Sequence, residues 1–402
     1  MNMQTTFSTP AIRLKTKFLT CVAFVPLLLT LNNHVYSQKH YPEDYPYIDI
    51  TEPPYNADNT GNTDATQAIN DALAKNGSSL HCDQDHPQGC YGHRGPVIYF
   101  PEGTYLISDR IMPTYEQDRS ISAAHIWIQG AGVDKTIIKL KDNARLYQDK
   151  NNPRSILRTG CDHRLKAHLA NAAFNNHVVD LTIENGKDNP GAIGLWFDVA
   201  NNGCVDNVKI VSKGEGFAGL SCDRVAGTGL VKNTEVIGFD YGVNYFLQDD
   251  ANNIVFEHIT LREQQIAGFK SECKMTVIRN LKSFQTRDIP AISLGTIHAM
   301  MILVGAELEG SENSTSAIEI LEGVPVYFND LNIKNYHTAI KQNNVFHPDI
   351  TNSGYIAEYM ATKDTFILNK EIKSSLQLPV RETPYYHAND TGLWVKATDF
   401  GA

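Results

Sequence analysis

The sequence is short of positive charge. Its 35 lysine and arginine residues are outnumbered by 45 aspartate and glutamate residues, and the formal net charge is −10. A protein that binds nucleic acid needs a basic surface to meet the phosphates, so we expect no nucleic-acid partner. The chain also lacks a nucleotide, flavin or haem signature and has no C-x-x-C pair of the kind that holds zinc. We therefore expect no cofactor.

Long apolar runs are missing too, apart from one of 14 residues, Phe18 to Leu31. This run is too short to span a bilayer comfortably. It follows a basic segment, Arg13 to Lys17, and precedes Val35-Tyr36-Ser37, which offers small residues where a signal peptidase reads the chain. The pattern predicts a signal peptide over residues 1–37, with a membrane anchor as the alternative. The mature protein would be secreted (periplasmic or on the cell surface in a bacterium) and would have no membrane contact.

Export would bring the cysteines into a compartment that permits disulfides. Cys82 and Cys90 enclose a short loop, and their spacing predicts a disulfide. Three histidines flank this loop and make a metal site the weaker alternative: His81, His86 and His93. Three further cysteines lie in or beside predicted strands, where we expect buried thiols acting as small apolar residues: Cys204, Cys222 and Cys273.

Repetition organises the middle of the chain. Seven strand-like segments begin 22 to 26 residues apart, from VVDLTIEN at 178 to PVYFNDLNI at 325. A second series of segments alternates with them, from GLWFD at 194 to AIKQN at 339. Each member of the second series begins with Gly or Ala, the small residue that a tight corner needs. Most segments then alternate apolar and polar residues, which is the period of a half-buried strand.

A strand-turn-strand unit of this length cannot bury its own inner face, so successive units must stack. Stacking would align one inward residue from each segment of the second series into an apolar row: Leu195, Leu220, Val243, Phe269, Ile292, Ile318 and Ile340. Helical periodicity is absent from this region. We therefore predict an all-β fold over residues 38–377, a single-stranded parallel β-helix. We expect it to be right-handed, because parallel crossovers prefer that hand.

Residues 64–75 are predicted to form a helix that caps the first coil. Asp64 stands at the N-cap position, and Gln67 follows three residues later, as in a capping box. One face of the helix carries the apolar residues Ala65, Ala68, Ile69, Ala72 and Leu73. An amphipathic helix at this place would cover the open end of the β-helix.

The helix segment NADNTGNTDATQAINDALAKNG, followed by GPVIYFPEGTYLIS at 95–108, resembles the opening of pectate-lyase-superfamily proteins. These proteins include rhamnogalacturonase/epimerase-like and pectate lyase 3 domains. IWIQGAGVDKTIIKL (126–140), NPGAIGLWFDVANN (189–202) and VIGFDYGVNY (236–245) resemble later coils of its glycoside hydrolase family 28-related and family 55-type members. The resemblance covers about residues 55–345 and implies a right-handed β-helix acting on extracellular polysaccharide. Hydrolases, lyases, epimerases and inert adhesins share this fold, so the fold does not choose among them.

Residues 378–402 are predicted to be a linker followed by a strand. Pro379 and Pro384 mark the linker, and the ending TGLWVKATDFGA resembles the strand with which family members begin. One interpretation is a two-β-helix protein, as in family 55-type glucanases, whose catalytic acid lies in the second half. A second β-helix unit would then be a partner of this one. The alternative is a plain strand packed on the solenoid.

The outward positions of the second series supply the candidate catalytic carboxylates. They lie two and four residues after each opening Gly or Ala and include Asp198, Asp223 and Glu272. Asp223 and Glu272 should be roughly 9.6 Å apart, near the spacing at which inverting glycosidases fit a water between acid and base. Asp198 and Asp223 should be about 5 Å apart, which suits a retaining mechanism. A solvated polar face without catalysis is the alternative.

Gln248-Asp249-Asp250 offers a second carboxylate pair. It resembles the paired aspartates of family 28 polygalacturonases, which act as acid and base. The Asn-Thr-Asp of that family does not precede it, and neither Gly-His-Gly nor Arg-Ile-Lys follows in later coils. Turn formation is therefore the alternative role of Asp249 and Asp250, because Asp and Asn bond their own backbone in turns.

Lyase chemistry would use a different set of residues. Lys270 beside Glu272 would be the base and Arg224 would neutralise the uronate, with Ca²⁺ as a cofactor only by analogy with the lyases. A Lys–Glu salt bridge is the structural alternative. Trp196 would stack on a sugar ring, unless residues 142–175 partly bury it. The remaining candidates for substrate binding are Asp198, Asn244, Glu319 and Arg224.

Three functions follow from these residues. The first is a glycoside hydrolase that cleaves extracellular polysaccharide with a carboxylate pair. The second is a polysaccharide lyase acting on a uronate-containing glycan. The third is a non-catalytic, carbohydrate-binding half of a two-β-helix enzyme.

Overall fold

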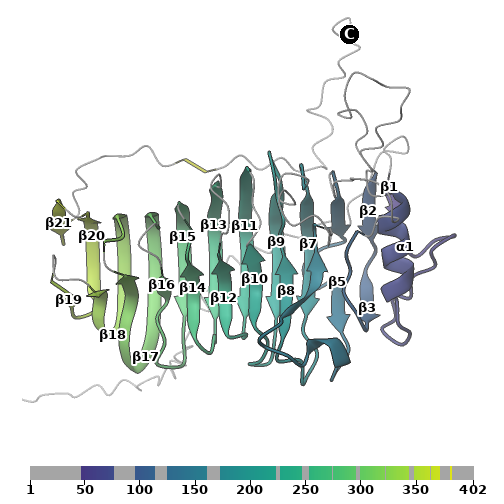
Figure 1. The fold of residues 1–402 in the computed structure, drawn as a ribbon, viewed down its shortest axis with the longest axis horizontal. Coiled ribbons are helices and arrows are strands. Elements are labelled where there is room, and N and C mark those ends of the chain that lie inside the picture. The colour runs from purple at the N-terminus through teal and green to yellow at the C-terminus, as the bar shows by residue number, and fades with distance from the viewer. Residues whose placement is uncertain are drawn as a thin grey trace, which may run out of the picture. The chain divides into compact units, whose positions relative to one another are not determined.

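A computed structural model describes residues 47–76, 96–113, 125–160, 173–222, 227–246, 253–273, 275–295, 299–321, 323–343, 348–362, 364–371 and 381–382. All of them belong to one compact unit, Gln38–Ala402. Their strands join into one sheet of 21 strands, most of them parallel, which coils on itself. The predicted parallel β-helix is confirmed, and Figure 1 shows its strands side by side from α1 to β21.

Several predictions fall on residues outside these ranges. They are the signal peptide over residues 1–37, the Cys82–Cys90 disulfide with its histidines, and the linker and strand over 378–402, of which only 381–382 are described. The prediction for the other cysteines can be checked. Cys222 and Cys273 are buried thiols, as predicted, and the Cys204 thiol is half-buried.

The helix α1 (Thr66–Asn76) caps the coils at the N-terminal side. Asp64 is the predicted N-cap, and its Oδ1 accepts a hydrogen bond from the backbone N–H of Thr66 at 2.9 Å. Gln67 does not complete a capping box, because its amide donates instead to Asp71 Oδ1 at 2.7 Å. The apolar face of the helix is buried as predicted, with Ile69 and Leu73 at 0% and 1% exposure.

Long strands form two of the three faces of the solenoid. The early coils use shorter pieces, β1 (Tyr47–Asp49), β2 (Val97–Phe100), β3 (Gly103–Ile107), β4 (Trp127–Gly130) and β5 (Thr136–Leu140). Later coils use β7 (His177–Glu184), β9 (Cys204–Val211), β11 (Thr228–Ile237), β13 (Asn253–Arg262), β15 (Thr276–Phe284), β17 (Met301–Leu321) and β18 (Val326–Asn343). From β7 to β17, each pairs in parallel with the next strand of this later series.

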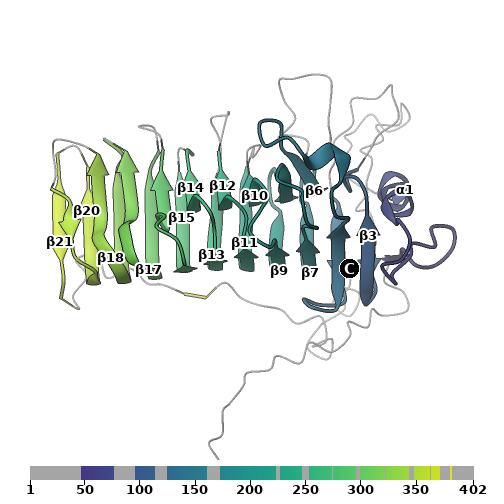
Figure 2. The same ribbon diagram turned by 90° about the horizontal axis from the view of Figure 1, so that it is seen from below.

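Short strands form the remaining face, which we call the short-strand sheet. It consists of β6 (Arg154–Arg158), β8 (Ala192–Trp196), β10 (Ala218–Cys222), β12 (Tyr241–Tyr245), β14 (Ala267–Ser271) and β16 (Ile292–Leu294), continued by the second halves of β17 and β18. Figure 2 shows these strands alternating with the long ones along the row. They correspond to the second series of repeats in the sequence.

Four successive long strands, β9, β11, β13 and β15, each bend at one residue with a left-handed backbone conformation. The bend is made by Asn207 (φ 55°), Asn233 (φ 49°) and Asn280 (φ 56°) in β9, β11 and β15, and by His258 (φ 54°) in β13. The parallel pairing skips these positions, so the strand on either side lies on a different face. Asparagine suits such a corner because its short polar side chain bonds locally and lowers the cost of this conformation. The first series of repeats therefore holds two strands per coil, which the sequence analysis had treated as one.

The predicted inward row of the short-strand sheet is present in full. The register aligns Leu195, Leu220, Val243, Phe269, Ile292, Ile318 and Ile340, one from each coil. All seven are 0% exposed. Phe269 also packs edge-on against Phe256 of β13, with ring centroids 5.0 Å apart. Burial of branched and aromatic side chains from every coil is what holds the coils together.

The glycines that begin the predicted repeat segments at 194 and 219 lie inside β8 and β10, where they are needed for packing rather than for a turn. At Gly194 a Cβ would lie 2.3 Å from Cγ2 of Ile210, and at Gly219 it would lie 2.1 Å from Cγ1 of Val236. Neither glycine has a positive φ. The tight-corner reason given for these residues is therefore wrong. They are small because a branched side chain from the facing long strand fills the space.

The C-terminal end of the solenoid changes to antiparallel pairing. β20 (Gly354–Ala361) pairs antiparallel with β18, β21 (Phe366–Asn369) pairs antiparallel with β20, and the short β19 (Ile350–Thr351) also joins β18. The repeat in the sequence ends with β18, so the period gave no signal for this hairpin.

Candidate functional site

The outward positions selected from the sequence lie in one row along the short-strand sheet, which begins one coil earlier at the buried Arg158. In the parallel register, one residue from each coil lies beside the equivalent residue of the following coil: Arg158, Trp196, Ser221, Asn244, Lys270, Ser293, Glu319 and Lys341. Four predicted outward positions are confirmed as partly exposed members of this row, those of Trp196, Asn244, Lys270 and Glu319. Coils stack about 4.8 Å apart, so the row presents polar groups at regular intervals.

Lys270 and Glu272 form an ion pair near the middle of this row. Nζ of Lys270 lies 2.9 Å from Oε1 of Glu272, and the side chains are 29% and 26% exposed. The same ammonium group lies 5.2 Å from the ring centroid of Tyr241. Glu272 also lies against Gly295 of the next coil. A Cβ added at Gly295 would be 3.0 Å from Cγ of Glu272. The carboxylate is therefore accessible and held in place by its neighbours.

Glu319 is held in a similar way, two coils further along. Its Oε1 accepts a hydrogen bond from the hydroxyl of Ser316 at 2.6 Å and lies 3.7 Å from Nζ of Lys341. Both described carboxylates on this face thus have a cation beside them and keep part of their surface open to water.

Asp198 is not on the outer face, and its predicted outward position is wrong. Its side chain is buried, and Oδ2 accepts a hydrogen bond from Nε of Arg158 at 2.7 Å. Strand β8 ends at Trp196, so the alternation of faces does not continue to Asp198. The hydroxyl of Thr159 accepts from the backbone N–H of Asp198 at 2.9 Å and donates to its carbonyl at 2.7 Å. Gly160 makes room, because a Cβ there would overlap the carboxylate.

Trp196 lies on the outer face and is half-buried. The guanidinium of the buried Arg158 lies 4.4 Å from its ring centroid, which is a cation–π contact. The buried pair of Arg158 and Asp198 therefore fixes the position of the indole ring from the coil below.

Four predicted site residues lie outside the described residues: Asp223, Arg224, Asp249 and Asp250. Asp223 and Arg224 follow β10, and Asp249 and Asp250 follow β12 after a short gap. The distances predicted between Asp223 and its neighbours therefore remain predictions.

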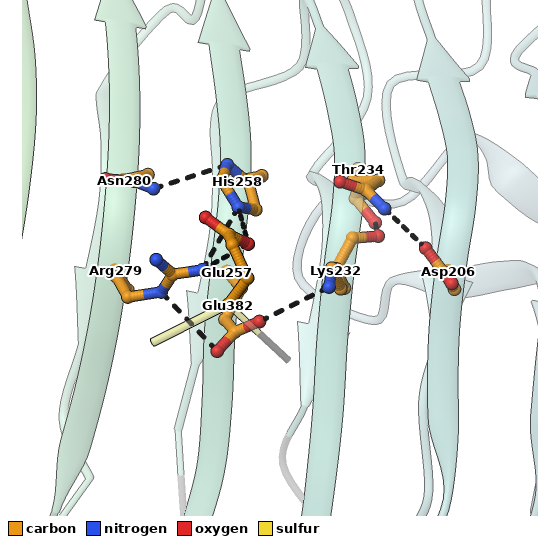
Figure 3. Close-up of polar contacts among 9 residues, drawn as sticks. Asp206, Lys232, Thr234, Glu257, His258, Arg279, Asn280 and Glu382 are labelled. Atoms are coloured by element: carbon orange, nitrogen blue, oxygen red, sulfur yellow. Dashed lines mark hydrogen bonds and ion pairs between the residues drawn. The ribbon is translucent and has the colours of Figure 1, made fainter. Parts of the chain in front are cut away.

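A second charged cluster lies on the outer face of the long strands before their corners, and the sequence analysis missed it (Figure 3). The register aligns Asp206, Lys232, Glu257 and Arg279, which alternate in sign from coil to coil. Nζ of Lys232 lies 3.7 Å from Oε2 of Glu257, and Nε of Arg279 lies 3.6 Å from its Oε1. Glu382, from the C-terminal part of the chain, joins the cluster at Arg279.

A signal for this cluster is present in the sequence. The tripeptides VDN, VKN, FEH and IRN stand at equivalent places in four successive repeats, with a charge of alternating sign before each corner residue. The predicted outward positions belong to the second series of repeats, whereas this alternation lies in the first.

Among the described residues, no group of three or more His, Cys, Asp or Glu is arranged to hold a metal ion. Within the same ranges, no helix is long and apolar enough to cross a membrane.

Solved structures with a similar fold are remote in sequence. ORF18 of Geobacillus virus E2 is 14% identical with a TM-score of 0.44, over 77% of this chain and 64% of that one. The enzymatically active domain of tailspike protein 2 of bacteriophage CBA120 is 10% identical with a TM-score of 0.44, over 73% and 40%. The iota-carrageenase of family GH82 from A. fortis is 13% identical with a TM-score of 0.42, over 73% and 57%. This chain spans less than two thirds of each of them.

A comparison with curated proteins gives no match. A family model does match, over residues 53–287, which is more than half of the 402 residues. The matched part begins before α1 and extends past the Lys270–Glu272 pair. The chain therefore belongs to the rhamnogalacturonase A/epimerase, pectate lyase-like family.

Proposed function

We propose that this protein is a secreted glycoside hydrolase that cleaves an extracellular polysaccharide on the outer face of its short-strand sheet. The observation that carries the proposal is the row from Trp196 to Lys341, with one polar or aromatic side chain from each coil. A polysaccharide is itself a row of repeated units, so neighbouring coils can contact neighbouring sugars. Membership in a pectate lyase-like family supports the same substrate class.

Glu272 is the proposed general base. The form of its side chain that pairs with Lys270 at 2.9 Å is the carboxylate, and it is exposed enough to contact a water molecule. A carboxylate in this state removes a proton from the water that attacks the sugar. Gly295 and Lys270 hold its position from two sides.

Asp223 is the proposed general acid. It stands two residues after Ser221, as Glu272 stands two residues after Lys270, and Ser221 and Lys270 are two coils apart in the same row. Two coils correspond to about 9.6 Å, which leaves room for a water between the carboxyl groups, as an inverting mechanism requires. Asp249 and Asp250 are the second candidate pair, because they follow the strand that lies between β10 and β14.

The same face supplies the substrate contacts. The ring of Trp196 would stack on a sugar, and Asn244 and Glu319 would form hydrogen bonds with sugar hydroxyls. Arg224 would meet an acidic group on the substrate. As a lyase base, Lys270 would first have to leave its ion pair with Glu272, so hydrolysis is the reaction that this geometry favours.

The test is an assay of the purified protein on a panel of polysaccharides, with reducing ends and the ultraviolet absorbance of unsaturated uronates measured together. We expect new reducing ends without absorbance, and a loss of about 10²-fold or more in kcat for Glu272→Gln and Asp223→Asn. Glu307→Gln is the matched control, because Glu307 is an ion-paired carboxylate of similar exposure on another face, 3.6 Å from Lys334.

Two results would contradict the proposal. Absorbance of unsaturated products, lost in Lys270→Gln, would identify a lyase. Binding without cleavage of any polysaccharide, by folded protein, would identify a carbohydrate-binding module.

A further inference from the structure

We propose that Arg279 and His258 form a carboxylate-binding site on the outer face of β13 and β15, and that its ligand is Glu382 of the same chain. The site holds Glu382 against the side of the solenoid. It lies on a different face of the solenoid from the proposed polysaccharide-binding row and does not depend on that function.

Two hydrogen-bond donors meet one oxygen of Glu382. Oε2 lies 2.5 Å from Nη2 of Arg279 and 2.9 Å from Nε2 of His258, although Glu382 and His258 are 124 residues apart in sequence (Figure 3). Charge-assisted bonds of this kind are about twice as strong as neutral ones. They lower the pKa of Glu382 to about 2, with the bond from Arg279 as the largest cause and the bond from His258 as the next.

The neighbours of His258 indicate which ring nitrogen donates to Glu382. Nδ1 of His258 lies 3.4 Å from Nδ2 of Asn280, an amide nitrogen that can only donate, so Nδ1 is the accepting nitrogen. Nε2 then carries the proton and donates it to Glu382. Arg279 and His258 are neighbours at 3.2 Å because they share the same acceptor.

Arg279 is available for Glu382 because it ends the row of alternating charges. Lys232 lies between two carboxylates, Asp206 and Glu257, in the register of the coils. Arg279 has Glu257 on one side and Val304 on the other. One side of its guanidinium therefore lacks a carboxylate from the sheet, and Glu382 takes that place.

His258 supports the proposal independently, because the fold does not require a histidine there. It occupies a left-handed corner at which the coils before and after it have Asn233 and Asn280. Asparagine adopts this conformation readily, so it would serve the corner equally well. An asparagine side chain is shorter than an imidazole and would not extend as far toward Glu382, so the contact with Glu382 is what the imidazole adds.

Hydrogen exchange of the full chain, measured by mass spectrometry over peptides that contain residues 378–386, tests the site. We expect Glu382→Gln and His258→Asn each to raise the exchange of these peptides by about two- to fivefold, the range for a partly exposed ion pair. His258→Asn should leave the fold intact because it inserts the residue of the neighbouring corners. Glu371→Gln is the matched control, since Glu371 is another exposed carboxylate in the same C-terminal part.

The outcomes separate clearly. Unchanged exchange in Glu382→Gln would overturn the proposal, and so would an equal rise in Glu371→Gln, because the effect would then be one of charge in general. A rise in Glu382→Gln without one in His258→Asn would remove His258 from the site. Circular dichroism melting of each variant, which we expect to match the parent, excludes loss of the fold as the cause.

Discussion

The buried ion pair between Arg158 and Asp198 gives one of the two largest effects that we expect from a single substitution. Asp198→Asn keeps the shape of the side chain but removes its negative charge. The guanidinium of Arg158, 2.7 Å away and buried, then remains in the protein interior without its carboxylate. Removing one partner of such a pair costs about 3–5 kcal/mol, because the remaining charge has lost the solvation of water.

Urea unfolding followed by circular dichroism measures this loss as a change in the midpoint at constant slope. Asp134→Asn is the matched control. Asp134 also pairs with a cation, Lys209 at 3.3 Å, but its side chain is 73% exposed. Water screens a pair of this kind, so we expect a change of at most about 1 kcal/mol. Tryptophan fluorescence should also change in Asp198→Asn, because Arg158 contacts the ring of Trp196.

A double variant separates charge burial from packing. Arg158→Met with Asp198→Leu removes both charges, and apolar replacement of a buried pair is often neutral or stabilising. We therefore expect the double variant to be more stable than Asp198→Asn alone. A loss below about 1 kcal/mol in Asp198→Asn, similar to that in the Asp134 control, would refute the reasoning, since the pair would then behave like an exposed one.

Four further results are expected. Phe269→Ala should cost about 3–5 kcal/mol in urea unfolding, because Phe269 is fully buried in the inward row. Gly219→Ala should lower the free energy of unfolding by about 1–3 kcal/mol, because the new Cβ would lie 2.1 Å from Cγ1 of Val236. Adding Val236→Ala to this variant should restore part of the lost stability. His258→Val should cost about 1–2 kcal/mol at its positive φ of 54°, whereas His258→Asn should change stability by less than about 0.5 kcal/mol. The bonds from Arg279 and His258 lower the pKa of Glu382 from 4.5 to about 2. The contact of Glu382 with these two residues should therefore be complete above pH 4.5, persist at pH 4 and be lost as the pH falls through about 2. Hydrogen exchange corrected for intrinsic rates checks this pH dependence.

The sequence predicted the short-strand sheet almost completely. Its strands alternate inward and outward residues and repeat at nearly constant spacing, and both properties are visible in one chain. The inward row from Leu195 to Ile340 and the outward position of Lys270 follow directly from that spacing. Stacking in register leaves little freedom once the period is known.

Features that break the alternation were not predictable in the same way. Asp198 follows the last residue of β8 by two positions, and there the chain turns inward to meet Arg158 from another coil. At the corners formed by Asn207 and Asn233, the strand passes from one face of the solenoid to another, although apolar and polar residues continue to alternate along the segment. A left-handed residue changes which side chains point inward, and the period alone does not contain that information.

The two charged faces of the solenoid differ in what their ion pairs do. On the long strands, Lys232 and Glu257 are buried and lie in a row of opposite charges, which favours coils stacked in register and leaves little surface for a ligand. Glu382 takes the remaining place beside Arg279. On the short-strand sheet, Lys270 and Glu272 form an ion pair within one coil at 2.9 Å, and each keeps about a quarter of its surface exposed. A substrate needs accessible polar groups, so exposure rather than charge singles out the short-strand sheet as the place to test for polysaccharide chemistry.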